Sequence, residues 1–164
     1  MKKCLMIFTA LLFSQTVSAE EQAFVSSRSL SLELANKLAM TAAQDCTKQG
    51  YQVSVAVTDR SGKLLAFNRN PLSGSHTIDV AILKAATAAS FQTATIEMMK
   101  GFDGLSNAPG VLLIGGGIPV KIGGHMYGAV GVSGAPAKKL TGDVDHACGQ
   151  KGIDAIKEAI EFAQ

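Results

Sequence analysis

A glycine-rich segment in the last third of the chain constrains the fold more than any other feature of the sequence. It reads GGGIPVKIGGHMYGAVGVSGAP and runs from residue 115 to residue 136. The pair Gly123-Gly124 is typical of a two-residue hairpin turn, and glycines inside strands allow another backbone to approach closely. We therefore interpret the segment as paired strands. Its composition indicates an architecture rather than a reaction.

Apolar periodicity and turn residues predict the other helices and strands. Helices are expected at about 32–49, 77–91, 95–100 and 143–162, with Ser31 as the N-cap of the first. Strands are expected at about 53–57, 64–68, 111–114, 118–122 and 125–133. Tight turns between successive strands require antiparallel pairing. We therefore expect an α+β domain in which helices flank a five-stranded antiparallel sheet.

The beginning of the chain has the pattern of a secretory signal peptide. Two lysines precede a mostly apolar run, and Val17-Ser18-Ala19 is typical of a cleavage site. The apolar run is too short to span a bilayer. We predict a periplasmic or secreted protein that is not inserted in the membrane after cleavage. Its predicted parts are a signal peptide (1–19), an N-terminal extension (20–29) and one domain (30–164).

The charge balance favours some partners over others. The chain has 15 Lys and Arg residues against 13 Asp and Glu residues, and two of its lysines lie in the predicted leader. The processed chain is therefore formally neutral, without the basic surface expected of a nucleic-acid-binding protein. We expect a small-molecule ligand and other copies of the same subunit as partners, and no nucleic acid.

Two cysteines, Cys46 and Cys148, remain after the predicted cleavage. Each follows the four-residue spacing of the apolar stripe of its helix. In an oxidising compartment the pair is expected to form a disulfide if the two helices pack together. The alternative is two buried thiols that pack as small apolar side chains.

The helix predicted at 77–91 has almost no polar face. Its aliphatic residues and alanines surround the helix axis, and a helix that is apolar nearly all round is buried on more than one side. One small sheet covers only one of these sides. We therefore expect a second subunit or a ligand against the other side.

Candidate site residues are few, because the ionisable groups form no cluster along the chain. His76, His125 and His146 are widely separated, which argues against a zinc site. Haem iron needs only one axial side chain and apolar walls, so a single histidine would be enough. The simpler interpretation of each histidine is an exposed polar residue.

Lys84 and Arg69 are the charged residues that stand out. Lys84 is the lone cation of the apolar helix, so it either extends to solvent along its aliphatic stem or faces a carboxylate of a ligand. Arg69, at the end of a predicted strand, has a similar candidate role. Thr87, one turn from Lys84, is a candidate hydrogen-bonding residue there.

Four stretches of the chain resemble the GlcG/HbpS family of haem-binding-protein-like domains. They are SVAVTDRSGKLLAFNR, ILKAATAASF, the glycine-rich segment and GDVDHACGQKGIDAI, and the resemblance covers about 30–162. The motifs K-A-x-T-A, G-G-[IV]-P and G-[AV]-x-G-V-S-G are specific in combination. The resemblance implies a profilin-like fold, assembly into multimers and binding of a tetrapyrrole. One departure is the RNPLS loop at 69–73, where relatives often have R-x-D-G-A.

Our hypothesis is a secreted protein that binds haem or another tetrapyrrole for scavenging, storage or sensing. The iron ligand is expected to be His125, His76 or Thr87, with Lys84 or Arg69 near the propionates. Cobalamin remains open as another tetrapyrrole ligand. One alternative is a small-molecule enzyme, such as one that degrades haem, although the sequence shows no general acid–base pair. A second alternative is a multimeric accessory or signalling module that binds a protein.

Overall fold

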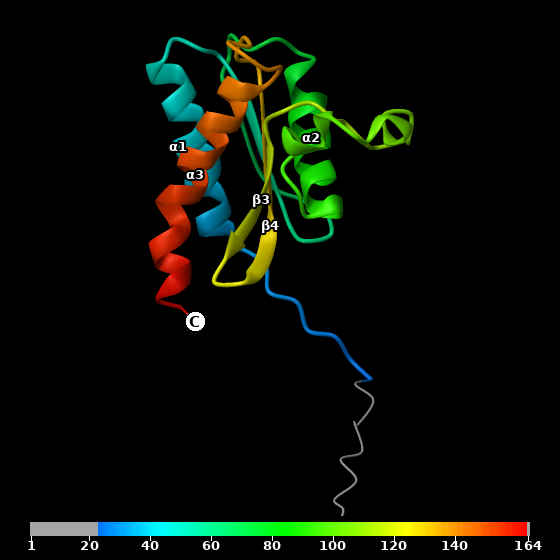
Figure 1. Ribbon diagram of the computed structural model, residues 1–164. Coiled ribbons are helices and arrows are strands. Elements are labelled where there is room, and N and C mark those ends of the chain that lie inside the picture. Colours follow the sequence, from blue (N-terminus) through cyan, green and yellow to red (C-terminus); the bar gives the residue numbers. More distant parts are fainter. Residues whose placement is uncertain (1–22, 164) are drawn as a thin grey trace, which may run out of the picture.

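The structure, a computed structural model, describes residues 23–163, so the predicted signal peptide lies outside the described residues. This part of the chain forms three α-helices, four strands and two 3₁₀ helices (Figure 1). In chain order they are α1 (Leu32–Lys48), β1 (Ser54–Thr58), β2 (Leu64–Arg69), α2 (Thr77–Phe91), η1 (Glu97–Met99), η2 (Asp103–Leu105), β3 (Gly117–Ile122), β4 (His125–Ser133) and α3 (Asp143–Glu161). The predicted α+β class is confirmed. The profilin-like assignment stays a prediction.

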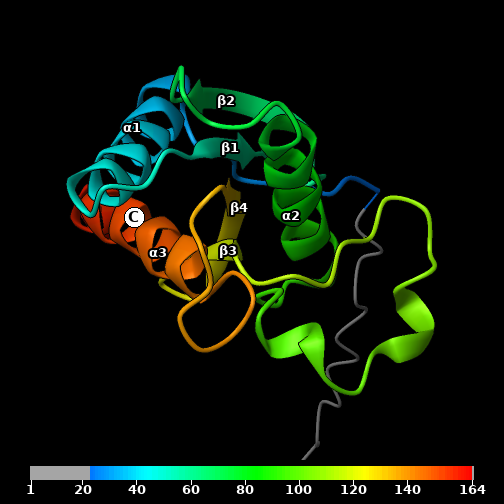
Figure 2. The ribbon, with the colours of Figure 1, turned by 90° about the horizontal axis from the view of Figure 1, so that it is seen from above.

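The four strands form one antiparallel sheet in the order β2-β1-β4-β3. Helices α1 and α3 cover one face of the sheet, and α2 covers the other face (Figure 2). Strand β3 is an edge strand, and the hairpin that joins it to β4 projects at one end of the molecule (Figure 1). At the other end, Ser54 in the centre of the sheet lies between Arg69 and Ser133.

Local sequence signals explain the positions of the helices and turns. Ser31 caps α1, as expected, by accepting a hydrogen bond from the Leu34 backbone N–H at 3.2 Å. The Asp59 carboxylate closes the turn between β1 and β2 by accepting hydrogen bonds from Ser61 and from the backbone N–H of Lys63. Short polar residues therefore fix the start of α1 and the turn between β1 and β2.

A disulfide joins the two helices that share one face of the sheet. Cys46 on α1 and Cys148 on α3 are bonded, are completely buried, and are 102 residues apart in sequence. They lie in the main apolar core, between α1, α3 and the sheet. Of the two interpretations of these cysteines, the disulfide is therefore confirmed, and the pair of free buried thiols is not found.

Helix α2 approaches the sheet closely because β4 carries a glycine beneath it. A Cβ atom at Gly131 would overlap the backbone carbonyl oxygen of Ala81. Small residues on both sides, including Ala56 and Ala85, let this helix pack directly on the strands.

The prediction of a five-stranded sheet is wrong, because residues 111–114 form no strand. The backbone of this apolar run bonds elsewhere: the Leu112 N–H donates to the Thr87 hydroxyl at 2.9 Å, and the Val111 N–H donates to the Ala108 carbonyl. The helix expected at 95–100 is shortened to η1. Among residues 23–163, no helix is both long enough and apolar enough to cross a membrane.

Candidate functional site

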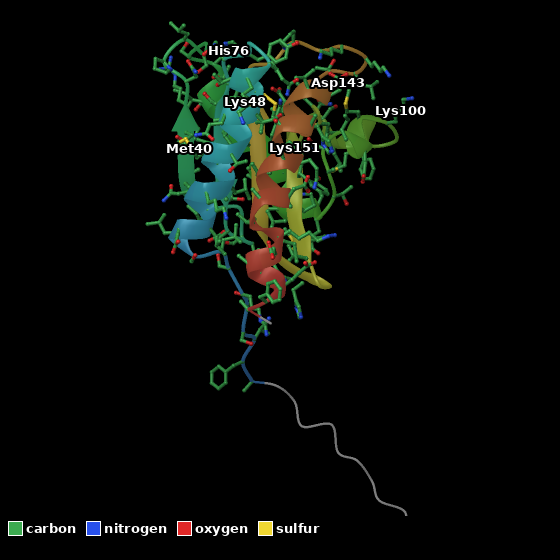
Figure 3. The ribbon with its side chains drawn as sticks, turned by 90° about the vertical axis from the view of Figure 1, so that its left-hand side faces the viewer. Met40, Lys48, His76, Lys100, Asp143 and Lys151 are labelled. Atoms are coloured by element: carbon green, nitrogen blue, oxygen red, sulfur yellow. A yellow bond between two sulfur atoms is a disulfide. The ribbon has the colours of Figure 1, made fainter. Side chains whose placement is uncertain are left out.

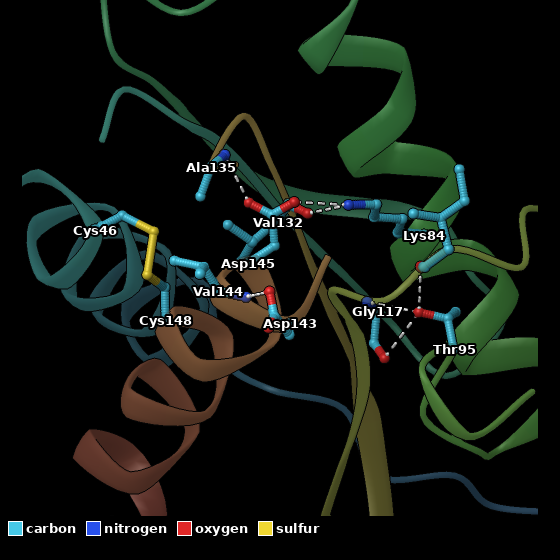
Figure 4. Close-up of polar contacts among 11 residues, drawn as sticks. Cys46, Lys84, Thr95, Gly117, Val132, Ala135, Asp143, Val144, Asp145 and Cys148 are labelled. Carbon is cyan, nitrogen blue, oxygen red and sulfur yellow. Dashed lines mark hydrogen bonds and ion pairs between the residues drawn. A yellow bond between two sulfur atoms is a disulfide. The ribbon is translucent and has the colours of Figure 1, made fainter. Parts of the chain in front are cut away.

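Lys84 lies in the core, and neither of its two sequence interpretations describes its contacts. Its side chain is 2 % exposed, and its Nζ donates to Asp145 Oδ2 at 2.8 Å and to the Val132 carbonyl at 2.9 Å (Figure 4). The second carboxylate oxygen of Asp145 accepts a hydrogen bond from the Ala135 N–H at 2.9 Å. The pair links α2 to α3 across the end of the sheet. Lys84 thus has an internal partner, and we leave it out of the proposed site.

The burial of this pair has an electrostatic cost. Loss of hydration lowers the pKa of Lys84 and raises the pKa of Asp145, while the attraction between the two charges opposes both shifts. Gly116, with φ of 115°, makes room for the pair, since a Cβ there would lie 3.0 Å from Lys84 Nζ and 2.9 Å from Asp145 Cβ. A residue with a side chain at position 116 would therefore crowd the ion pair.

Thr87 also has a partner inside the protein. It is 1 % exposed, and its hydroxyl accepts the hydrogen bond from the Leu112 N–H. Thr95 acts in the same way, since its hydroxyl accepts from the Gly117 N–H and donates to the Ile114 carbonyl (Figure 4). These two threonines hold the segment that leads into β3.

Arg69 and His76 lie far from the β3–β4 hairpin. Arg69 Nη2 donates to the Ser73 carbonyl at 2.7 Å, within its own loop. His76 is exposed and directly precedes α2, at the end of the molecule opposite the N-terminal arm (Figure 3). Arg69 on β2 pairs with Ser54 on β1, which in turn pairs with Ser133 on β4. Ser133 is eight positions along β4 from His125, so Arg69 and His125 lie at opposite ends of the sheet. The structure does not bring these two candidates to the same place as His125.

His125 lies at the hairpin tip and borders a hollow of about 280 Å³. The other residues that line this hollow, here called the tip hollow, are Arg60, Gln92, Lys121, Gly124 and Met126. The His125 ring lies edge-on to Tyr127, with ring centroids 6.4 Å apart. The tip hollow therefore combines one imidazole with two cations.

His146 borders a second hollow of about 390 Å³, between β3, α3 and the segment that follows α2. This hollow, here called the side hollow, is lined by Gln92, Thr93, Ala94, Glu97, Ile118, Pro119, Lys121, His146 and Gln150. Ala94 and Ile118 are almost fully buried and give it an apolar floor. The side hollow therefore combines a histidine, which is one of the side chains that bind haem iron, with an apolar floor, while most of its other lining residues are polar.

The imidazole of His146 has an unsatisfied nitrogen. Its Nδ1 is buried and has no hydrogen-bond partner within the described part of the chain. Burial lowers the pKa of His146, while the nearby Glu97 carboxylate acts in the opposite direction. A half-buried, neutral imidazole is the form that binds metal ions. The expectation that this histidine is simply exposed is therefore wrong.

The two hollows are neighbours, because Gln92 and Lys121 line both of them. The two hollows adjoin along the edge strand β3, and the pair is here called the β3-edge groove. Of the five predicted site residues, His125 lines the β3-edge groove. The other four, Lys84, Thr87, Arg69 and His76, do not line it. Sequence reasoning missed Arg60, Lys121, Glu97 and His146. The scarcity of histidines was the one signal that pointed to His146.

Comparison with known proteins gives a consistent family assignment. The model of a family described as haem degrading protein HbpS-like matches residues 30–154. The protein GlcG of Escherichia coli K12 is 33% identical over 112 residues, which cover 63% of this chain and 81% of GlcG.

Solved structures of similar proteins extend this result. A double mutant of Streptomyces reticuli HbpS is 35% identical, with a TM-score of 0.76 over 86% of this chain and 96% of that one. The structure of a PduOC complex with haem is 25% identical, with a TM-score of 0.68 over 78% of this chain and 95% of that one.

Proposed function

The chain belongs to the HbpS-like family, and from this premise we propose that it binds haem in the β3-edge groove. The observation that carries the proposal is His146, which lines a hollow with an apolar floor and whose Nδ1 is buried without a hydrogen-bond partner among residues 23–163. The haem that is bound by the similar PduOC protein supports the choice of ligand.

The residues of the groove fit the chemistry of haem. His146 would hold the iron as its axial ligand, since neutral imidazole is a common ligand of haem iron. Ala94, Ile118 and Pro119 would contact the apolar macrocycle. Lys121, which lines both hollows, would face the carboxylate side chains. His125 is the second candidate for the axial ligand, because it lines the adjoining hollow.

Haem, when bound, supplies a redox-active iron, and the protein supplies the environment of that iron. The floor of the side hollow would exclude water from one side of the ligand. The α3 backbone fixes the position of His146, because the backbone N–H of His146 donates to the Gly142 carbonyl at 2.9 Å. These contacts suit binding and orientation. We therefore propose scavenging, storage or sensing as the role, with haem degradation as the alternative that the family description favours.

Absorption spectroscopy with site variants tests this proposal. The processed chain, residues 20–164, is titrated with haemin, and the Soret band is followed in the wild type, His146→Ala, His125→Ala and His76→Ala. We expect His146→Ala to lose the wild-type spectrum and His76→Ala, an exposed histidine outside the groove, to keep it. Failure of the wild type to bind haem would refute the function. Wild-type spectra for both groove variants would refute the site.

A second experiment separates a carrier from a degrading enzyme. The haem-loaded protein is incubated with ascorbate in air, and the Soret band is followed with time. A carrier retains the band and returns intact haem on extraction. A degrading enzyme loses the band and releases open-chain tetrapyrrole products, which chromatography detects.

We also propose that the mature protein is exported to the periplasm or the medium. The leader pattern at 1–19 and the buried disulfide between α1 and α3 support this location, because disulfides persist in oxidising compartments. Amino-terminal sequencing of the protein recovered from the periplasm checks the proposal. A chain that begins near Glu20 is expected, whereas a full-length cytosolic chain would contradict it.

Assembly into a homo-oligomer is the remaining part of the proposal. The sheet covers one face of α2, while Ile82, Leu83 and Phe91 elsewhere on the helix are only half-buried in the single chain. A second copy would bury this apolar surface further. Light scattering during size-exclusion chromatography should give a multimer for the wild type and a smaller species for Leu83→Glu. A monomeric wild type at all concentrations would refute this part.

A further inference from the structure

The tip hollow carries more positive charge than the simple binding of an apolar macrocycle requires. Arg60 comes from the turn between β1 and β2, Lys121 from β3 and His125 from the start of β4. None of the residues described as lining it is acidic. Three separate segments of the chain thus bring cationic and imidazole groups to one concave surface.

The nearest acidic residue in sequence is already engaged. The Asp59 carboxylate, next to Arg60, accepts hydrogen bonds from the backbone N–H groups of Ser61 and Lys63 at 2.8 and 2.9 Å. It also accepts a hydrogen bond from the Ser61 hydroxyl at 2.8 Å. The described contacts of Asp59 are therefore within its own turn, and the exposed side chain of Arg60 makes no ion pair among residues 23–163.

Lys121 is held in place by a hydrogen bond to the end of α2. Its Nζ donates to the Gln92 carbonyl at 2.6 Å, and Gln92 ends α2 with φ of 52°. Gln92 is the one non-glycine residue with positive φ among residues 23–163. Helices commonly end with a residue in this left-handed conformation. Here it directs a carbonyl group toward Lys121, at the boundary between the two hollows.

From this geometry we propose that the tip hollow is a carboxylate subsite of the tetrapyrrole site. The inference rests on the proposed haem binding in the side hollow. Arg60 and Lys121 receive the carboxylate side chains that lie together on one edge of the macrocycle. The groove thereby selects tetrapyrroles with free carboxylates at one edge over neutral tetrapyrroles of the same size.

Comparison of haemin with haemin dimethyl ester tests the subsite directly. The two compounds share iron and macrocycle, and they differ in whether their two carboxyl groups are free and charged or are neutral methyl esters. Both are titrated against the wild type in the same mild detergent, at low and at high salt. We expect the wild type to bind haemin at least about tenfold more tightly, because charge-assisted hydrogen bonds are lost with the ester. Salt should weaken the binding of haemin and leave that of the ester unchanged.

Three charge variants complete the experiment. Arg60→Gln and Lys121→Gln should each remove most of the preference for haemin while the ester binds as it does to the wild type. Lys63→Gln is the matched control, because Lys63 is an exposed cation of the same turn and does not line the tip hollow. It should retain the full preference.

The outcomes separate this inference from the proposed function. Equal binding of haemin and its ester by the wild type, with both lost in His146→Ala, would refute the subsite and leave haem binding intact. A loss of affinity for both compounds in Arg60→Gln would also refute it, because that result indicates a structural role. Binding of neither compound by the wild type would refute the proposed function itself.

Discussion

Replacement of Lys84 by methionine tests whether the buried ion pair is a structural latch between α2 and α3. The side chains have similar length, so the change removes a charge and little volume. It leaves the Asp145 side chain 4 % exposed, with backbone N–H groups such as that of Ala135 as its hydrogen-bond donors. Breaking a buried pair from one side costs about 3–5 kcal/mol, because an uncompensated charge stays in the core. The cost is large for a domain of this size.

Thermal and urea unfolding measure this loss. For a processed chain of this length we expect a decrease in Tm of about 10–20 °C. The double variant Lys84→Met/Asp145→Leu should recover most of the lost stability, since both charges are then absent. Lys157→Met is the control, because its ion pair with Glu161 is exposed and should be worth about 0–1 kcal/mol.

The pH dependence of the Lys84→Met variant gives an independent check. Burial already raises the pKa of Asp145, and loss of the lysine removes the attraction that opposes this shift. A carboxyl group whose pKa is higher in the folded state destabilises the fold at neutral pH, and this penalty disappears as pH falls toward the unfolded value. The stability difference from the wild type should therefore narrow on acidification. A loss below about 1 kcal/mol, or a double variant as unstable as the single one, would refute the latch.

Three further predictions concern the stability of the fold. Replacement of Cys46 and Cys148 by serine should cost about 4–5 kcal/mol in urea unfolding, from the loop of 102 residues that the disulfide closes, and a loss under about 1 kcal/mol would contradict this. Hydrogen bonds from the backbone N–H of Lys138 and neighbouring residues lower the pKa of Asp143 to about 2, so the destabilisation by Asp143→Ala should be present above pH 4 and vanish as pH falls toward 2. A pH-independent difference in Tm would refute that explanation. Gly131→Ala should displace α2 or prevent folding, since the new methyl group meets the Ala81 carbonyl, whereas an unchanged circular dichroism spectrum and Tm would show that the helix has room.

Periodicity and capping predicted most of the secondary structure because those signals are local. Helix α2 occupies the predicted range, Ser31 caps α1, and the Gly123-Gly124 turn joins β3 to β4. The cysteines were placed on facing apolar stripes, which was enough to suggest their disulfide. The helices, the cap and the turn depend on residues within a few positions of one another, and the disulfide followed from the apolar face of each of two helices.

The errors came from contacts between distant residues. The apolar run at 111–114 reads like a buried strand, but the Thr87 hydroxyl takes one of its backbone donors from 25 positions away. Lys84 pairs with Asp145 at a separation of 61 residues, and nothing in the local pattern of either helix indicates this. The hollow beside His146 is formed in part by the segment after α2, which is about 50 residues away in sequence.

The location of the iron in crystals of the haem complex tests the central claim most directly. Crystals of residues 20–164 grown with haemin are measured at a wavelength where iron scatters anomalously. Our account predicts an iron peak in the β3-edge groove, within bonding distance of the His146 imidazole. An iron peak beside His76, or one against the outer face of α2, would contradict it.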